Sequence, residues 1–161
     1  MEHQIDRITI RTAGAEDAPV LASLINKAFA VEKFIDGTRT DEERLAETMR
    51  KGDVLVAERV SQAVACVYVE LRGERAYFGM LAVDPTQQHQ GLGKLMTTAA
   101  EDFGRKHGCK HMDITVLSLR PELPPLYRKL GYSETGTEEF HPERPLKGGV
   151  QCHCIVMSKP L

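Results

Sequence analysis

The sequence predicts a mixed α/β fold. The spacing of apolar residues changes repeatedly between the period of a strand and that of a helix along the chain. Three strand-like runs follow one another in the middle, and a strand, a helix and another strand follow in the second half. With 161 residues, 42% of them hydrophobic, the chain has the size of one domain and can bury a substantial core. We therefore expect a single domain over residues 1–161.

The chain begins with a predicted strand and two predicted helices. Apolar and polar residues alternate over residues 8–12, as in a half-buried strand. Over residues 16–29 apolar side chains recur at helical spacing. Asp17 and Pro19 lie near the start of this segment, where both residue types are favoured in helices. A second helix is predicted from residue 40 or 41 to residue 49, because its acidic first turn suits the positive end of a helix dipole. This part therefore contributes one edge strand and two covering helices.

The remaining elements alternate in type. Short turns separate three apolar runs that predict antiparallel strands, at residues 54–57, 63–71 and 76–83. After them the pattern predicts a long amphipathic helix, a strand, a short helix and two closing strands, at residues 91–107, 112–116, 123–132, 133–140 and 152–158. The apolar residues 155–157 could leave an exposed edge that pairs between subunits, or they could be covered within the monomer.

The charge and the terminal sequence exclude several classes of protein. Lys and Arg number 21 against 23 Asp and Glu, a net charge of -2, so nothing favours binding to nucleic acid or to an anionic membrane surface. Residues 1–7 lack the apolar core of a signal peptide, and no apolar run is long enough to span a bilayer. We expect a cytoplasmic protein.

The four cysteines predict neither disulfides nor a metal site. Cys66, Cys109, Cys152 and Cys154 are too few and too scattered for a disulfide framework in a chain of this length. Alternation in a strand would turn Cys152 and Cys154 to one face and His153 to the other, and no second pair with zinc spacing exists. We expect reduced thiols and no metal.

The glycine-rich segment after residue 83 predicts an anion-binding site. An apolar strand leads into Gln88-x-x-Gly91-x-Gly93 and then into a long helix, whose first turn offers N–H groups without intrahelical partners. The Walker loop is excluded because Lys94 is followed by leucine and because position 88 is not glycine. The dinucleotide fingerprint is excluded because Met96 replaces its third glycine. A phosphate or pyrophosphate is the predicted ligand.

This loop resembles the Q/R-x-x-G-x-G/A signature of the GNAT superfamily of N-acetyltransferases. A second motif at the expected distance, Leu126-Tyr127-Arg128-Lys129-Leu130-Gly131-Tyr132, resembles the L-Y-x-K-x-G-F/Y helix ending of the same family. The resemblance covers nearly the whole chain. It implies a mostly antiparallel twisted sheet of six to seven strands with a splayed parallel pair, flanked by about four helices.

The resemblance also implies a cosubstrate and the residues that hold it. Acetyl-coenzyme A would bind with its pyrophosphate on the loop and its pantetheine arm against the backbone of the preceding strand. The implied contacts are Leu81, Val83, Gln88, His89, Gln90, Gly91, Leu92, Gly93, Lys94 and Tyr127. Tyr127 would be the catalytic acid that protonates the departing thiolate. Transfer to a primary amine would be direct, because no cysteine stands with a base and an orienting group.

The sequence departs from the family pattern where the acceptor amine would lose its proton. Tyr77 occupies the position at which some members carry a glutamate base, Arg120 replaces a common asparagine, and Leu123 replaces a common alanine. The general base is therefore not identified. Acidic and aromatic residues of two links are the candidate substrate contacts: Phe29, Glu32 and Phe34, then Glu138, Glu139, His141 and Glu143.

Three functions remain open at this point. The first is an N-acetyltransferase that acts on a small-molecule or protein amine, as a monomer or a homodimer. The second is a coenzyme A binding sensor without turnover, which the missing strand glutamate favours. The third is a protein interaction domain that has lost its site.

Overall fold

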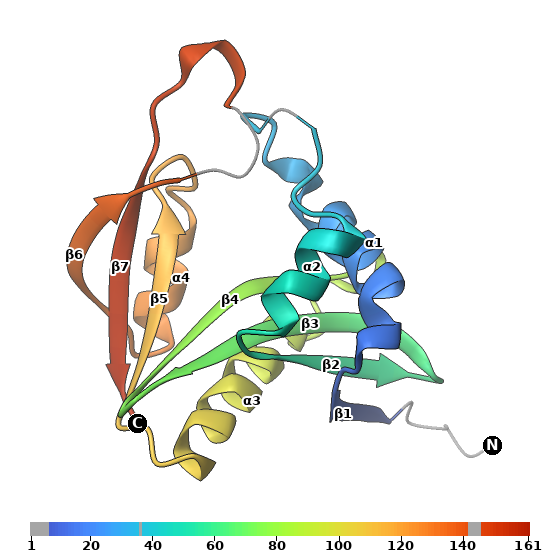
Figure 1. Cartoon of the computed structure of the whole chain (residues 1–161). Coiled ribbons are helices and arrows are strands. Elements are labelled where there is room, and N and C mark those ends of the chain that lie inside the picture. Colours follow the sequence, from blue (N-terminus) through green and yellow to red (C-terminus); the bar gives the residue numbers. More distant parts are fainter. Residues whose placement is uncertain (1–6, 36, 142–145) are drawn as a thin grey trace.

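A computed structural model of the chain describes residues 7–35, 37–141 and 146–161 (Figure 1). Seven strands, four α-helices and four short 3-10 helices follow one another in these segments. In chain order they are β1 (Ile8–Thr12), η1 (Ala15–Asp17), α1 (Ala18–Ala28), η2 (Phe29–Val31), α2 (Glu42–Met49), β2 (Asp53–Arg59), β3 (Gln62–Arg72), β4 (Arg75–Val83), η3 (Pro85–Gln87), α3 (Leu92–Lys106), β5 (His111–Leu117), α4 (Leu123–Lys129), β6 (Ser133–Glu139), η4 (Lys147–Gly149) and β7 (His153–Pro160).

The strands form one mixed sheet in the order β1-β2-β3-β4-β5-β7-β6. Every neighbouring pair is antiparallel except β4 and β5, which are parallel. Those two strands pair only over residues 75–77 and 111–113, and beyond this point they diverge (Figure 1). The sheet therefore consists of two arms, a larger one of β1 to β4 and a smaller one of β5, β7 and β6. The arms are joined at one end and open at the other.

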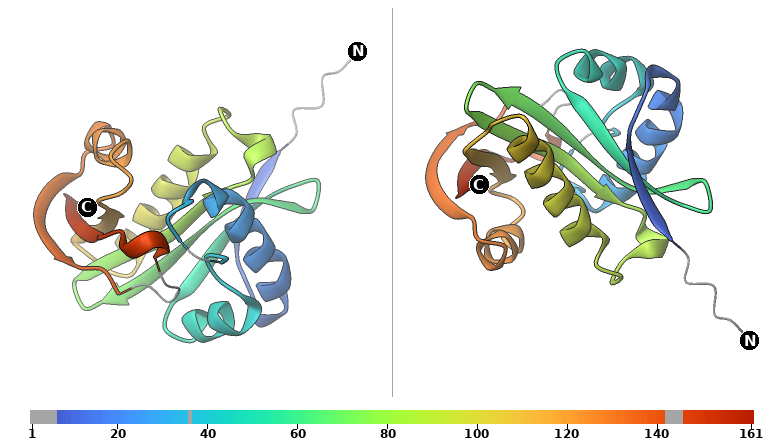
Figure 2. Two further views of the ribbon diagram at one scale, coloured as in Figure 1. Left: turned by 90° about the horizontal axis from the view of Figure 1, so that it is seen from above. Right: turned by 90° about the horizontal axis from the view of Figure 1, so that it is seen from below.

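Helices cover both faces of the larger arm (Figure 2). On one face α1 packs on β3 and β4 and also contacts α2, while on the other α3 packs on β2, β3, β4 and β5. The helix α3 buries Leu92, Met96, Ala100 and Gly104, spaced four residues apart, so one stripe of the helix faces the sheet. Two hydrophobic clusters result, one on each face of the sheet.

The predicted fold class is confirmed, and the element boundaries differ in one instructive place. The helix predicted over residues 16–29 is divided into η1, α1 and η2. Pro19 lies in the first turn of α1, where its missing N–H costs no hydrogen bond, so the α-helix begins at Ala18. At the other end, the φ of −91° and ψ of 5° at Phe29 tighten the chain into a 3-10 turn.

The last strand is not an edge of the sheet. β7 lies between β5 and β6, so the apolar residues 155–157 are covered within the monomer. The outer strand on this side of the sheet is β6, which is exposed along its whole length and carries Glu134, Glu138 and Glu139. Charged side chains at a sheet edge disfavour pairing with another chain.

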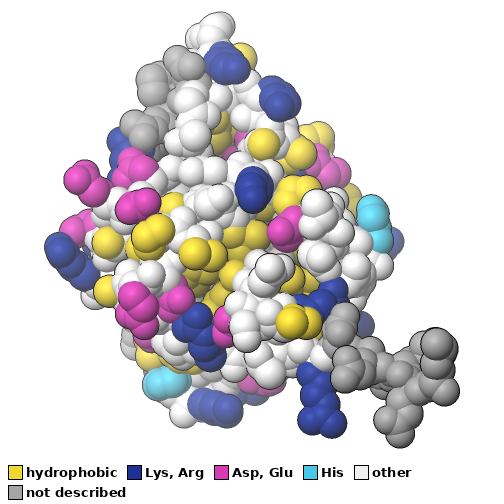
Figure 3. Space-filling model, turned by 90° about the vertical axis from the view of Figure 1, so that its right-hand side faces the viewer, with side chains coloured by type: hydrophobic (Ala, Val, Ile, Leu, Met, Phe, Trp, Pro, Cys, Tyr) yellow, Lys and Arg dark blue, Asp and Glu magenta, His cyan; other side chains and the backbone are white. Residues whose placement is uncertain are grey.

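The surface carries charges of both signs. Figure 3 shows a central hydrophobic area surrounded by basic and acidic side chains, without an extended basic patch on the part of this face that the structure describes. Among the described helices, none is both long and apolar enough to cross a membrane.

Candidate active site

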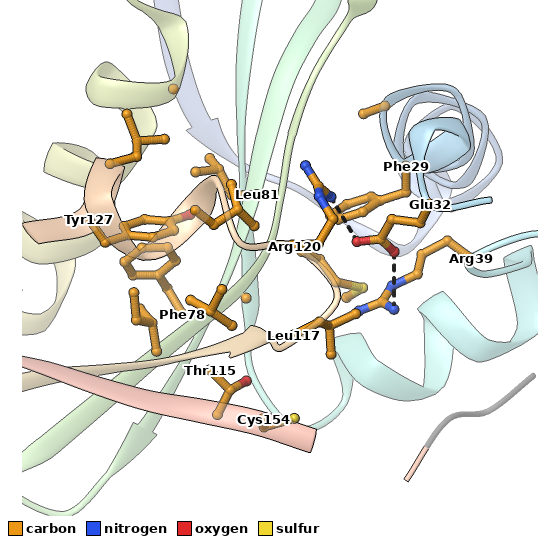
Figure 4. A pocket seen from close by; sticks show the side chains of 18 of the residues that line it. Phe29, Glu32, Arg39, Phe78, Leu81, Thr115, Leu117, Arg120, Tyr127 and Cys154 are labelled. Carbon is orange, nitrogen blue, oxygen red and sulfur yellow. Dashed lines mark hydrogen bonds and ion pairs between the residues drawn. The ribbon is translucent and has the colours of Figure 1, made fainter. Parts of the chain in front are cut away.

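A cavity of about 470 Å³ lies in the opening between β4 and β5 (Figure 4). Its walls come from both diverging strands, from the start of α3, from α4 and from the link after α1. The site residues predicted from the sequence that line it are Phe29, Glu32, Leu81, Val83, Gln88, Gly93 and Tyr127. The structure therefore brings both sequence motifs to one hollow.

A bulge in β4 shapes one wall of this cavity. Opposite β3 the register slips between Cys66, which pairs with Ala82, and Tyr68, which pairs with Gly79. Met80, in the slipped segment, has a φ of +48°, which is uncommon for a residue other than glycine. Beyond Tyr77 no strand in the described part of the chain pairs with the β5 side of β4. Backbone groups of this segment can therefore bond a ligand instead.

The glycine loop closes one end of the cavity. Gly91 caps α3 with a φ of +76°, and a Cβ built on Gly91 or Gly93 would have no atom of a described residue within 4 Å. His89 also has a positive φ, of +65°. In the part of the chain that the structure describes, no side chain caps the first turn of α3. The N–H groups of this turn can thus be reached by an anion, and the predicted phosphate site stays a prediction.

Three of the predicted loop residues have side chains turned elsewhere. Leu92 is buried in the core beneath α3. Lys94 lines a separate hollow with Lys129 and Lys159. The amide oxygen of Gln90 accepts a hydrogen bond of 2.8 Å from Arg59. His89, Gln90, Gly91, Leu92 and Lys94 do not line the cavity, so any ligand contact they make would involve the surface of the loop.

Arg59 holds the glycine loop through side-chain hydrogen bonds. The sequence did not predict this role. Its Nη1 donates hydrogen bonds to the side-chain oxygens of Gln87 and Gln90. Arg59 ends β2, about thirty residues earlier in the chain, and only the pairing of β2 with β3 and of β3 with β4 brings it to the loop. No local pattern marks it in the sequence.

Tyr127 projects into the cavity from α4. Its ring packs on Phe78, at 6.1 Å between centroids, and on Tyr132, at 5.9 Å. Figure 4 shows its hydroxyl pointing toward Leu81. Burial raises the pKa of Tyr127 to about 12, against a smaller lowering by the Arg120 guanidinium. The phenol is therefore held in its protonated form, as a proton donor must be.

At the opposite end Glu32 lies between two arginines (Figure 4). The Glu32 side chain is only 3% exposed, and its Oε2 accepts a hydrogen bond of 2.8 Å from Arg120 Nη1. Its Oε1 lies 3.6 Å from Arg39 Nη1 and has no hydrogen-bond donor among the described residues. The sequence predicted Glu32 as a substrate contact but did not identify Arg39, which has no motif around it.

The other candidates occupy different positions. Phe34 does not line this cavity, and its backbone oxygen accepts a hydrogen bond from the backbone N–H of Lys147. Glu138 and Glu139 are exposed on β6, His141 is exposed, and Glu143 lies outside the described residues. Tyr77 lines the cavity, with its hydroxyl over Gly79 and 3.4 Å from Thr115 Oγ1.

One cysteine of the described chain lines the cavity, and its thiol is not activated. All four thiols are free, and Cys154 lies in the cavity wall. Burial raises the pKa of Cys154, which lowers the amount of reactive thiolate. In the described segments no group of three or more His, Cys, Asp or Glu side chains is placed to hold a metal ion.

Comparison with known proteins identifies a matching family. The model of the acetyltransferase (GNAT) domain matches residues 50–134, which is more than half of the chain. The sequence has no significant match among curated proteins.

Solved structures share the whole fold. The ribosomal-protein-S18-alanine N-acetyltransferase of Escherichia coli superposes with a TM-score of 0.79 at 20% identity, over 96% of this chain and 94% of that one. PaiA N-acetyltransferase of Thermoplasma acidophilum, in complex with coenzyme A, gives 0.77 at 18% identity, over 96% and 99%. YncA of Salmonella typhimurium, with its cofactor acetyl-CoA, gives 0.73 at 21%, over 96% and 94%. At these identities the likeness concerns the fold.

Proposed function

The chain belongs to the GNAT acetyltransferase family, and we propose that it transfers the acetyl group of acetyl-CoA directly to a primary amine of a small molecule or protein. The observation that carries this proposal is the cavity where β4 and β5 diverge, with the glycine loop at one end and Tyr127 in its wall. Two structural neighbours were solved with acetyl-CoA or coenzyme A, which supports the choice of donor.

The open loop suits the diphosphate of coenzyme A. Around Gly91 and Gly93 no atom lies within 4 Å of an added Cβ, so a phosphate can approach the backbone closely. The first N–H groups of α3 and the positive end of its dipole would then face the anion. Arg59 would hold Gln87 and Gln90 and so keep the loop in shape.

The unpaired side of β4 suits the pantetheine arm and the thioester. Backbone groups of Leu81 and Val83 would pair with the amides of the arm, as an added strand does with a sheet edge. An N–H in the bulged segment around Met80 would donate to the thioester oxygen as negative charge develops on it. Such a donor contributes about 3 kcal/mol to transition-state stabilisation.

Tyr127 would complete the transfer. The amine nitrogen attacks the thioester carbonyl carbon, and the carbon–sulfur bond breaks with its electron pair left on sulfur. The Tyr127 hydroxyl then gives its proton to this thiolate, and the proton released by the new amide nitrogen restores the phenol through solvent. No cavity-lining carboxylate other than that of Glu32 is present in the described chain, so the amine must react from its neutral fraction.

Calorimetry with acetyl-CoA tests the cosubstrate, with ATP and NAD as controls. We expect micromolar binding of acetyl-CoA alone, followed by thiol release that depends on an added amine. Binding of ATP or NAD with equal affinity, or no binding of acetyl-CoA, would contradict the proposal.

A coenzyme A sensor without turnover is the second candidate. Tyr77 stands where some members of the family have a glutamate base, and Glu32 is already paired with Arg120, which together favour this alternative. Tight acetyl-CoA binding with no amine-dependent thiol release, in wild type and Tyr127→Phe alike, would support the sensor over the enzyme.

A further inference from the structure

The end of the cavity at Glu32, opposite the glycine loop, is the proposed acceptor end, and among the described residues it carries more basic than acidic side chains. Its charged lining residues, among those the structure describes, are Glu32, Arg39 and Arg120. A second cavity of about 240 Å³ shares Phe29, Glu32 and Arg39 with the first and adds Lys33 and Lys147. Among the described residues, these two neighbouring hollows are thus lined by one carboxylate and four cationic side chains.

Glu32 cannot serve as a free anion for a cationic amine. Its carboxylate already accepts from Arg120 at 2.8 Å and lies 3.6 Å from Arg39. A bare ammonium in this place would meet excess positive charge. Such an environment favours the neutral amine that the reaction needs, but it also weakens the binding of an acceptor that carries no negative group.

Arg39 still has hydrogen bonds to offer. The distance of 3.6 Å to Glu32 Oε1 is too long for a hydrogen bond, and no hydrogen bond from Arg39 to another described residue is formed. Its guanidinium lies over the Phe29 ring, 5.1 Å from the centroid, and its side chain is 27% exposed. The Phe29 ring therefore orients the Arg39 guanidinium, but its N–H donors have no acceptor among the described residues. These donors are available to an oxyanion.

Arg120 is partly saturated in the same region. Nη1 bonds Glu32, and Nε bonds Glu122, a residue outside the cavity wall whose side chain is 58% exposed. The remaining donors of its guanidinium are not used by these contacts. Together Arg39 and Arg120 surround the acceptor end from two different links, one after α1 and one after β5.

We propose that the acceptor is an amine that also carries a carboxylate, which binds Arg39 and the free donors of Arg120 while the amine faces the thioester. This inference rests on the proposed acetyltransferase function and specifies its substrate class. A small amino acid satisfies it, whereas a simple alkylamine or a polyamine does not.

Matched acceptors test the carboxylate directly. Thiol release from acetyl-CoA is measured at pH 8 with the standard amino acids, β-alanine and γ-aminobutyrate, and with the amide of each. The amide of an α-amino acid has a less basic amine, so it reacts more readily unless the carboxylate is recognised. We expect the best amino acid to exceed its amide by about tenfold or more in kcat/KM, as for a lost charge-assisted hydrogen bond.

The variant Arg39→Gln tests whether Arg39 binds the carboxylate of the acceptor. Its KM for the best amino acid should rise about tenfold, with kcat and the KM for acetyl-CoA unchanged and the weak rate with the amide unchanged. Arg39→Lys should recover part of the affinity, since it keeps the charge but loses the fork. Arg50→Gln, on the exposed surface of the α2 end, is the matched control and should have no effect.

The outcomes separate the two proposals. Equal or better use of amides and alkylamines would overturn the carboxylate inference and leave the acetyltransferase in place. An unchanged KM in Arg39→Gln would also overturn it. Failure to acetylate any acceptor, despite bound acetyl-CoA, would overturn the proposed enzyme and the inference with it.

Discussion

The two ends of the cavity differ in the groups that line them: one is formed mainly by backbone and the other mainly by side chains. The proposed donor end consists of backbone: the bulge of β4, the open turn at Gly91 and the first N–H groups of α3. The acceptor end consists of charged and aromatic side chains, Phe29, Glu32, Arg39 and Arg120, supplied by two links. A backbone site depends on conformation and tolerates most side-chain changes, whereas a side-chain site changes its ligand with one substitution.

Gly91→Glu should have the largest effect, because it tests the backbone end. A carboxylate about 4 Å from a phosphate costs roughly 4 kcal/mol at an effective dielectric of 20, so acetyl-CoA affinity should fall by roughly 1,000-fold. Calorimetry measures this loss. The fold should remain, with local strain from the φ of +76°, since a Cβ there meets no atom of a described residue within 4 Å.

Gly73→Glu is the matched control for Gly91→Glu. Gly73 has a φ of +66° and the same open surroundings, but it lies in the turn between β3 and β4, whose ends pair at Arg72 and Arg75. Both variants carry the same backbone strain and the same new charge. Equal acetyl-CoA affinity in the two would show that the loop does not hold the diphosphate.

Tyr127→Phe should lower kcat about 100-fold, the lower range for a lost general acid. The affinity for acetyl-CoA and the melting temperature should stay unchanged, because the ring contacts with Phe78 and Tyr132 are kept. Tyr132→Phe is the contrast: its hydroxyl donates to buried Glu101 at 2.7 Å, so its loss should cost stability of about 1–3 kcal/mol and leave kcat near wild type. A small drop in kcat for Tyr127→Phe would remove the tyrosine from the reaction.

The pH profile provides a second check on Tyr127. Its pKa is raised to about 12, so it stays protonated below that pH, whereas an ordinary tyrosine would be half ionised near pH 10. We expect kcat to rise as the acceptor amine loses its proton and to show no descending limb between pH 9 and 11. A decline in kcat centred near pH 10 would indicate a proton donor with the pKa of an ordinary tyrosine. The buried Tyr127 would then not be the group that protonates the thiolate.

The same contrast explains what the sequence could predict. The glycines and the strand-loop-helix order lie within a few consecutive residues, so Gly91 and Gly93 could be found from local pattern. Tyr127 was found in the same way. Arg120 lies 88 positions from Glu32, and that partnership exists only because the links after α1 and after β5 meet. Arg39 and Arg59 carry no local signal, and the position of β7 inside the sheet could not follow from chain order.

Arg120→Gln sharpens the comparison at the side-chain end. It leaves Glu32, with a side chain only 3% exposed, close to Arg39 alone, so the free energy of unfolding in urea should fall by about 3 kcal/mol. The double variant Glu32→Gln, Arg120→Gln should recover more than half of this loss, because no unpaired charge is then buried. Arg50→Gln breaks an exposed pair with Glu47 and should change stability by less than about 0.5 kcal/mol. Additive losses in the double variant would show that the pair is not coupled.

Arg59→Ala should have the smallest effect, because here a side chain only supports the backbone end. Losing its hydrogen bonds to Gln87 and Gln90 frees the loop but removes no group that is proposed to touch the diphosphate, so acetyl-CoA affinity should fall about fivefold. Arg105→Ala, which breaks an exposed pair with Asp102 at the far end of the same α3 helix, should leave affinity unchanged. If Arg59→Ala weakened binding as strongly as Gly91→Glu, the guanidinium itself would be a ligand, and the donor end could no longer be described as a backbone site.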